Sequence, residues 1–217
     1  MSEYRVTDRG GPAPRMIVRY TDRTRLNHWF VALMFFGAGL TGLAIFHPFF
    51  YPLVNLFGGG VWTRILHPFF GVVMALGFFG LFLAMWRDNA IDANDRAWLR
   101  EMPKLVRGNE EAMPPVGKNN AGQKLVFWTA AVGLLVLLVT GFIFWSPWFA
   151  PVFPVVAKRI AVVLHAFAAT ILILAIIIHI YASIWVKGST AAMTRGTVPE
   201  GWARLHHPLW WRQMTGK

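Results

Sequence analysis

The residues of this 217-residue chain best suited to chemistry are its histidines, because the chain has no cysteine. The lack of cysteine excludes disulfides, thiolate zinc sites, cysteine-ligated iron–sulfur clusters and covalent haem attachment. Four histidines lie within or beside long apolar segments: His28, His67, His165 and His179. An ionisable side chain in such a segment is a functional candidate, because burying it in hydrocarbon is unfavourable.

Two of these histidines share one face of one predicted helix. His165 and His179 are 14 residues apart in an apolar segment without Asp, Glu, Lys or Arg. At about 100° per residue, this separation falls about 40° short of four full turns. At a rise of about 1.5 Å per residue, the two side chains lie about 21 Å apart along the axis. They are therefore expected near opposite faces of a membrane.

Each of these two histidines has a partner at its own depth. His67 lies at the start of the second apolar segment, on the side expected to be outer, and is level with His165. His28 lies at the start of the first apolar segment, on the opposite, inner side, and is level with His179. Two imidazoles at one level can provide both axial ligands of a b-type haem, which brings its own equatorial nitrogens and prefers an apolar pocket. The sequence therefore predicts two haem b groups, one in each leaflet, that pass electrons and bind neither oxygen nor substrate.

Two alternatives stay open for the histidines. A histidine in a membrane helix can serve only to form a hydrogen bond to a neighbouring helix, and this role is sufficient to explain one isolated histidine. His47 also lies at the outer end of the first span; we favour His67 because Pro68 is expected to fix the start of its helix. His206 and His207, in the polar C-terminal region, are expected to be surface residues.

The histidines must be positioned by segments long enough to cross a bilayer, which takes about 20 residues. The four predicted spans contain no Asp, Glu, Lys or Arg and are Trp29–Phe46, Pro68–Trp86, Leu125–Trp145 and Ile160–Val186. The chain is 56% hydrophobic and only 14% charged, against roughly 45–50% and 25% in a soluble domain. It is predicted to be an all-α membrane protein, a bundle of four transmembrane helices.

The distribution of basic residues predicts the orientation of the bundle. Of the 21 lysines and arginines, 18 flank the same side, and the positive-inside rule makes that side cytoplasmic. Both termini and the loop 87–124 are then expected on the cytoplasmic side of the membrane, a bacterial inner membrane. The formal charge of +11 does not indicate nucleic-acid binding, because lipid head groups account for basic residues at membrane flanks.

The chain divides into three parts along its length. Residues 1–27 form a cytoplasmic N-terminal arm, residues 28–187 the transmembrane domain with its two haem sites, and residues 188–217 a cytoplasmic tail. Within the loop 87–124, the segment Asp95–Val106 is expected to form a short amphipathic helix near the membrane surface.

Six short motifs occur in order along the chain: RLNHWF from Arg25, RILHPFFG from Arg64, GKNNAGQK from Gly117, LLVTGFIFW from Leu137, LHA from Leu164 and IHIYASIWVKGS from Ile178. They resemble the gamma subunit of membrane-bound respiratory formate dehydrogenase, a four-helix cytochrome b with two haems. The resemblance runs from about Met16 to near Trp211, and the first 15 residues carry none of it.

The resemblance implies specific haem ligands. The family's ligands fall on His67 and His165 for the outer haem and on His28 and His179 for the inner haem, with none at the position of His47. It implies no catalytic residue in this chain, since formate is oxidised on a partner subunit.

The resemblance also implies an electron path and partners. Electrons come from a molybdenum or tungsten alpha subunit through an iron–sulfur beta subunit to the outer haem, then to the inner haem and to menaquinone or ubiquinone. Quinone reduction on the cytoplasmic side contributes to the proton motive force. The alpha and beta subunits and this chain form a heterotrimer, and the resemblance is compatible with a trimer of these heterotrimers. The quinone is expected beside Asn120 and Gln123.

The residues themselves leave two roles open for Asn120 and Gln123. Their neutral amides, three residues apart just before the third span, can share one helix face and donate hydrogen bonds to a quinone carbonyl. Asn120 can also cap the helix, with Gln123 completing the cap, and the two roles can coexist. Lys124 and Lys187 are expected to face lipid phosphate, and Arg64 an outer haem propionate.

Two other functions remain compatible with these patterns. One is the cytochrome b subunit of a membrane-bound hydrogenase or of a similar quinone-linked oxidoreductase. Such a subunit holds its haems in the same way but receives electrons from another donor. A non-haem transporter or structural anchor uses the histidines for packing alone, and the purified protein is then colourless.

Overall fold

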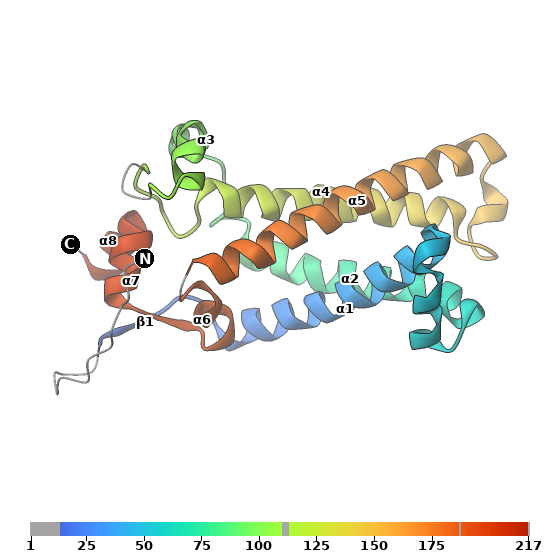
Figure 1. The fold of residues 1–217 in the computed structure, drawn as a ribbon, viewed down its shortest axis with the longest axis horizontal. Helices are drawn as coiled ribbons and strands as arrows, with labels where there is room; N and C mark the ends of the chain where they lie inside the picture. Colours follow the sequence, from blue (N-terminus) through green and yellow to red (C-terminus); the bar gives the residue numbers. More distant parts are fainter. Residues whose placement is uncertain (1–13, 110–112, 187, 217) are drawn as a thin grey trace.

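The computed structural model describes residues 14–109, 113–186 and 188–216. Four long helices run through the molecule: α1 Asp22–Phe46, α2 Gly60–Met85, α4 Ala121–Phe144 and α5 Val155–Trp185. They lie along the long axis of the molecule (Figure 1), and each is long and apolar enough to cross a membrane. The predicted all-α membrane fold is confirmed.

Two helical hairpins make up this bundle. The helix α1 packs mainly against α2, and α4 packs mainly against α5. The buried cluster between them consists of Ala38, Met74, Ala130, Leu134 and Leu172. Many larger apolar side chains instead point outward; Leu33, Leu76 and Val163 are 63%, 68% and 68% exposed. An outer surface of this kind suits lipid, since a water-soluble protein would bury it.

The two ends of the bundle differ in construction. At one end lie α3 Ala93–Val106, α6 Ser189–Thr194, α7 Glu200–His206 and α8 Pro208–Thr215, together with the first and last described segments of the chain (Figure 1). We call this the cap end. At the opposite end, which we call the far end, the 3-10 helices η1 Pro48–Phe57 and η3 Ala150–Val152 lie in the connections between the long helices.

The second span begins earlier than predicted. The φ angles of Gly58 and Gly59 are +82° and +96°, a conformation that favours glycine, and these residues end η1 and let α2 start at Gly60. Pro68 therefore lies inside the helix, about two turns from its start. The expectation that Pro68 marks the first turn and so fixes the start of the helix was wrong.

The cap is tied together by a small sheet that we did not predict. The strand β1 Met16–Val18 pairs antiparallel with β2 Thr197–Pro199, so that the described part of the N-terminal arm is joined to the tail. Ile17 and Val198 face each other in the pairing and are both buried. They belong to a second apolar cluster with Ala192, Ala203 and Trp210.

The amphipathic helix predicted within the loop 87–124 is present as α3. Asp92 caps it, because its Oδ1 accepts hydrogen bonds from the backbone N–H groups of Asn94 and Asp95. In return, Asp95 Oδ2 accepts from the backbone N–H of Asp92 at 2.7 Å. These reciprocal bonds satisfy N–H groups that a helix start otherwise leaves unpaired.

Candidate functional site

The far-end histidine pair joins the two hairpins. His67 on α2 and His165 on α5 have ring centroids 6.2 Å apart. Both rings are held by threonines of the neighbouring helix in their own hairpin. Thr41 on α1 lies 3.0 Å from His67 Nδ1, and Thr140 on α4 lies 2.9 Å from His165 Nδ1.

These threonines determine which ring nitrogen carries the proton. Thr41 donates its hydroxyl hydrogen to the carbonyl of Gly37 at 2.6 Å, and Thr140 donates to that of Val136 at 2.6 Å. Because each hydroxyl hydrogen is used in this way, each Oγ1 accepts from the histidine Nδ1–H. The Nε2 atoms of both rings therefore keep their lone pairs, which is the form that binds a metal.

Glycines beside the threonines let the histidine rings approach. A Cβ on Gly42 would lie 3.0 Å from His67 Cε1, and one on Gly141 would lie 3.5 Å from His165 Cε1. A Thr-Gly pair on the first helix of each hairpin thus supports a histidine on the second. Sequence reasoning missed Thr41 and Thr140, although the repeated Thr-Gly at corresponding depths of two spans is a usable signal.

The cap-end histidine pair is spaced in the same way but is held differently. His28 on α1 and His179 on α5 have ring centroids 6.3 Å apart. His28 Nδ1 is buried and has no hydrogen-bond partner. Within the described part of the chain, no hydrogen bond reaches the ring of His179 either.

Both spacings fit a haem iron between the rings. A metal–imidazole bond is about 2.0–2.1 Å long, and a ring nitrogen lies about 1.1 Å from its ring centre when ring bonds are about 1.3 Å. Two rings that share one metal therefore have centroids about 6.3 Å apart. No group of three His, Asp or Glu side chains suited to a metal occurs among the described residues. The donor set therefore fits a porphyrin, which needs only two axial ligands.

The structure separates the other histidines from these pairs. His47 ends α1, is exposed, and accepts a hydrogen bond at Nδ1 from the backbone N–H of Phe49. His207 was expected at the surface, and that was wrong. It is only 4% exposed, and its Nδ1–H donates to the carbonyl of Gly117 at 2.8 Å. Burial, followed by the nearby charge of Arg19, lowers the pKa of His207 to about 3.

Asn120 and Gln123 form a complete helix cap at the start of α4. Asn120 Oδ1 accepts from the backbone N–H of Gln123 at 2.9 Å, and Gln123 Oε1 accepts from the backbone N–H of Asn120 at 3.0 Å. The capping role is therefore confirmed. It uses the two amide oxygens and leaves both NH₂ groups as donors that make no hydrogen bond to another described residue.

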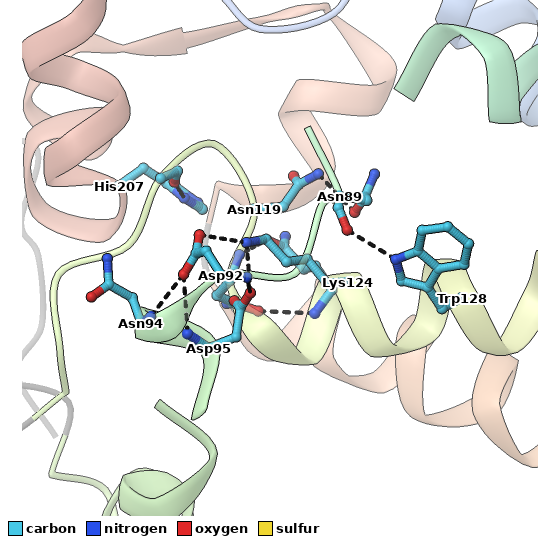
Figure 2. A network of polar contacts seen from close by, with 11 residues as sticks. Asn89, Asp92, Asn94, Asp95, Asn119, Lys124, Trp128 and His207 are labelled. Atoms are coloured by element: carbon cyan, nitrogen blue, oxygen red, sulfur yellow. Dashed lines mark hydrogen bonds and ion pairs between the residues drawn. The ribbon is translucent and has the colours of Figure 1, made fainter. Parts of the chain in front are cut away.

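A charged cluster fixes this part of α4 to α3 (Figure 2). Lys124 Nζ lies 3.0 Å from Asp92 Oδ2 and 2.9 Å from Asp95 Oδ2. Lys124 is 7% exposed, so the expectation that it faces lipid phosphate was wrong, because two carboxylates already neutralise it. Lys187 lies outside the described residues. Desolvation raises the pKa of Asp92, but the hydrogen bond and charge of Lys124 and two backbone N–H groups outweigh it, and the pKa is lowered.

Asparagines extend the polar cluster toward the end of α2. Asn119 donates to Asn89 Oδ1 at 3.0 Å, and Trp128 Nε1–H donates to the backbone carbonyl of Asn89 at 2.9 Å (Figure 2). Asn89 is 1% exposed, and its amide also donates to the carbonyl of Met85. These bonds fix the connection between α2 and α3 to the first turns of α4.

Comparison with known proteins identifies relatives over nearly the whole chain. The prokaryotic cytochrome b561 family matches residues 19–196. The cytochrome b556(fdo) subunit of formate dehydrogenase from Escherichia coli is 46% identical over 91% of this chain and 93% of its own length. The nitrate-inducible b556(Fdn) subunit from the same organism is 42% identical over 92% of each chain. The cytochrome b556 subunit of formate dehydrogenase from Haemophilus influenzae is 39% identical over 91% of this chain and 83% of its own length. The resemblance inferred from the six motifs is confirmed, and the chain belongs to the prokaryotic cytochrome b561 family, among the cytochrome b subunits of formate dehydrogenases.

Proposed function

We propose that this chain is the membrane subunit through which electrons from formate reach quinone. His67 and His165 hold one b haem at the far end, and His28 and His179 hold a second at the cap end. The observation that carries the proposal is the pair of ring spacings, 6.2 and 6.3 Å, at opposite ends of one apolar bundle.

The two bound haems supply one-electron carriers that connect an iron–sulfur donor to quinone. The four imidazoles would hold the two haem irons, one pair at each site, and would leave no coordination position for oxygen or substrate. The apolar helices around them exclude water and ions from the space between the two sites. The histidines therefore confine this subunit to electron transfer, and the chemistry on formate belongs to a partner.

The charge distribution supports a direction for the reaction. Basic residues gather at the cap end, which supports a cytoplasmic location for that end and a location outside the bacterial inner membrane for the far end. On a molybdenum or tungsten alpha subunit outside, formate becomes carbon dioxide, one proton and two electrons. An iron–sulfur beta subunit then delivers the electrons to the far end, and such heterotrimers can assemble further as trimers.

The cap of α4 provides the quinone contact. The NH₂ groups of Asn120 and Gln123 donate to a quinone carbonyl, while their oxygens keep the helix capped. Menaquinone or ubiquinone takes up two electrons and two cytoplasmic protons to form the quinol. Because electrons move inward and protons are consumed inside, the reaction contributes to the proton motive force.

Two arginines are placed to meet the haem propionates. Arg25 precedes His28 by three residues, and Arg64 precedes His67 by three residues. Each arginine therefore shares a helix face with its histidine and lies one turn nearer to that end of the bundle. Arg25 Nε is buried without a hydrogen-bond partner, although Nη1 pairs with Asp22 at 2.7 Å. At the far end, Arg64 is exposed and donates from Nε to the carbonyl of Gly60.

The choice of formate over hydrogen as the electron source rests on the relatives, which all bear formate dehydrogenase names. A hydrogenase-linked subunit would use the same histidines with another donor. Co-purification of the complex separates the two: a formate-oxidising partner supports the proposal, and a hydrogen-oxidising partner contradicts it. Membership in a cytochrome family argues against a non-haem transporter or anchor.

The proposal is tested with the purified complex. Formate should reduce both b haems, and added quinone should reoxidise them. Gln123→Glu keeps an oxygen for the cap but removes the NH₂ donor, and Asn120→Ser likewise keeps a capping oxygen. Both should slow quinone reduction while both haems stay bound. Haems that formate cannot reduce would contradict the function, and unchanged quinone kinetics in both variants would contradict the quinone contact.

A further inference from the structure

The two histidine pairs differ in what holds the nitrogen that faces away from the iron. At the far end, His67 Nδ1–H has both Thr41 Oγ1 at 3.0 Å and the carbonyl of Ala38 at 3.2 Å as acceptors. His165 Nδ1–H has Thr140 Oγ1 at 2.9 Å. At the cap end, His28 Nδ1 is buried without a partner.

This hydrogen bond changes the electronic character of a ligand. An imidazole that donates its second N–H to an oxygen becomes a stronger electron donor to a bound metal. Stronger donation stabilises the oxidised iron and lowers its reduction potential, and hydrogen bonding around the ligands is one of the few means by which a protein sets haem potentials.

We propose that Thr41 and Thr140 lower the reduction potential of the far-end haem below that of the cap-end haem. They act as positioning residues through His67 and His165, so that an electron from the outer iron–sulfur donor moves downhill toward the quinone side. One electron leaves the far-end iron, which is oxidised, and enters the cap-end iron, which is reduced. This inference rests on the proposed haem ligands and adds a cause for the direction of transfer.

The geometry makes both threonines specific for this role. Each one donates to its own helix, to the carbonyl of Gly37 or Val136, and is thereby left to accept from the ring. Thr170 on α5 makes the same kind of bond to its own helix, donating to the carbonyl of Ala166 at 2.9 Å, but makes no hydrogen bond to any of the histidines, all of which are described. It is therefore a matched control.

The test is a spectroelectrochemical redox titration of the purified haem-loaded complex. In the wild type, two potentials are expected, and the lower one should match the single haem that remains in a His28→Ala variant. Thr41→Val and Thr140→Val should each raise the lower potential, and the double variant should raise it further. The higher potential should stay in place, and Thr170→Val should change neither potential. Thr140→Ser, which keeps the hydroxyl, should retain the wild-type value.

The outcomes distinguish this inference from the function on which it rests. Both haems retained with unmoved potentials in the valine variants would overturn the role of the threonines, as would a higher potential at the far end in the wild type. If a valine variant loses haem, the corresponding alanine variant replaces it in the same titration. A wild-type protein without two b haems would instead refute the proposed function.

Discussion

The far-end and cap-end histidine pairs have nearly the same ring spacing, 6.2 and 6.3 Å, but the protein fixes them in different ways. At the far end, threonine hydroxyls hold the rings themselves. At the cap end, the neighbours of His28 hold its helix: Asn27 donates to the carbonyl of Gly77 at 2.9 Å, and Trp29 donates to that of Met193 at 3.0 Å. A similar ring spacing can therefore be supported either at the histidine ring itself or at the backbone that carries it.

This difference also divides the molecule by the kind of interaction that stabilises each end. The far end depends on contacts within two helical hairpins. The cap end depends on contacts between segments distant in sequence, such as the pairing of β1 with β2 and the ion pairs of Lys124. Changes at the cap should therefore disturb the cap-end site first.

The largest expected effect comes from removing one ligand at each end. His67→Ala should remove the far-end haem, so that formate no longer reduces the other haem while quinol still does. His28→Ala should do the reverse: formate still reduces the remaining haem, but quinone does not reoxidise it. Reduction kinetics from both sides measure this contrast. His47→Ala is the control and should keep both haems; identical behaviour of the first two variants would remove the distinction between the ends.

The next effect concerns the buried cation at the cap. Lys124→Gln leaves Asp95, which is 7% exposed, without its partner, and breaking a buried pair in this way costs about 3–5 kcal/mol. Lys118→Gln breaks a more exposed pair with Asp88 and should cost about 0–1 kcal/mol. Thermal unfolding measures both, and on heating Lys124→Gln should lose the cap-end haem first. Equal melting temperatures of the two variants would contradict a stabilising role for the ion pairs of Lys124.

Acid should loosen the cap end and leave the far end in place. Burial and Arg19 lower the pKa of His207 from 6.5 to about 3 in the folded protein. Below pH 6.5 the unfolded chain therefore binds more protons than the folded one, and stability falls as the pH decreases toward 3. Hydrogen exchange of the tail, measured between about pH 7 and pH 4 and corrected for the pH dependence of the intrinsic rate, should show protection that decreases as the pH falls. His207→Gln should weaken this pH dependence, and an unchanged dependence would assign it to other groups.

The smallest effect compares two glycines at the far end. A Cβ at Gly42 would lie 3.0 Å from His67 Cε1, so Gly42→Ala forces the ring to move by a few tenths of an ångström. At Gly141 the distance to His165 Cε1 is 3.5 Å, an ordinary contact, and Gly141→Ala should be tolerated. The absorption band of the far-end haem should change only in the first variant. Similar spectra for both would mean that His67 is not held tightly.

The sequence was sufficient for features with a strong local pattern. Four uncharged apolar runs predicted the helices, and the spacing of His165 and His179 predicted one shared face. The amphipathic helix expected at Asp95–Val106 is present as α3. These predictions succeeded because hydrophobic length and helical period act within one segment.

Features that depend on contacts between distant segments were missed. Lys124 and His207 were expected to be exposed because their side chains are polar. Their burial depends on neighbours distant in sequence: the carboxylates at the start of α3 for Lys124, and the connection before α4 for His207. The strands β1 and β2 have three residues each, and their central paired residues are 181 positions apart (198 − 17), so no local pattern reveals them. Pro68 misled the assignment of the start of α2, because the positive φ angles of Gly58 and Gly59 begin the helix earlier.

The most direct test of the paired histidines is the ratio of haem b to polypeptide in the purified protein and in its single histidine variants. Two haems per chain are expected in the wild type. One haem should remain when a histidine of either pair is replaced, with the other pair's haem unaffected. A wild type with one haem or none, or replacements that leave both haems bound, would contradict the existence of two bis-histidine sites in this bundle.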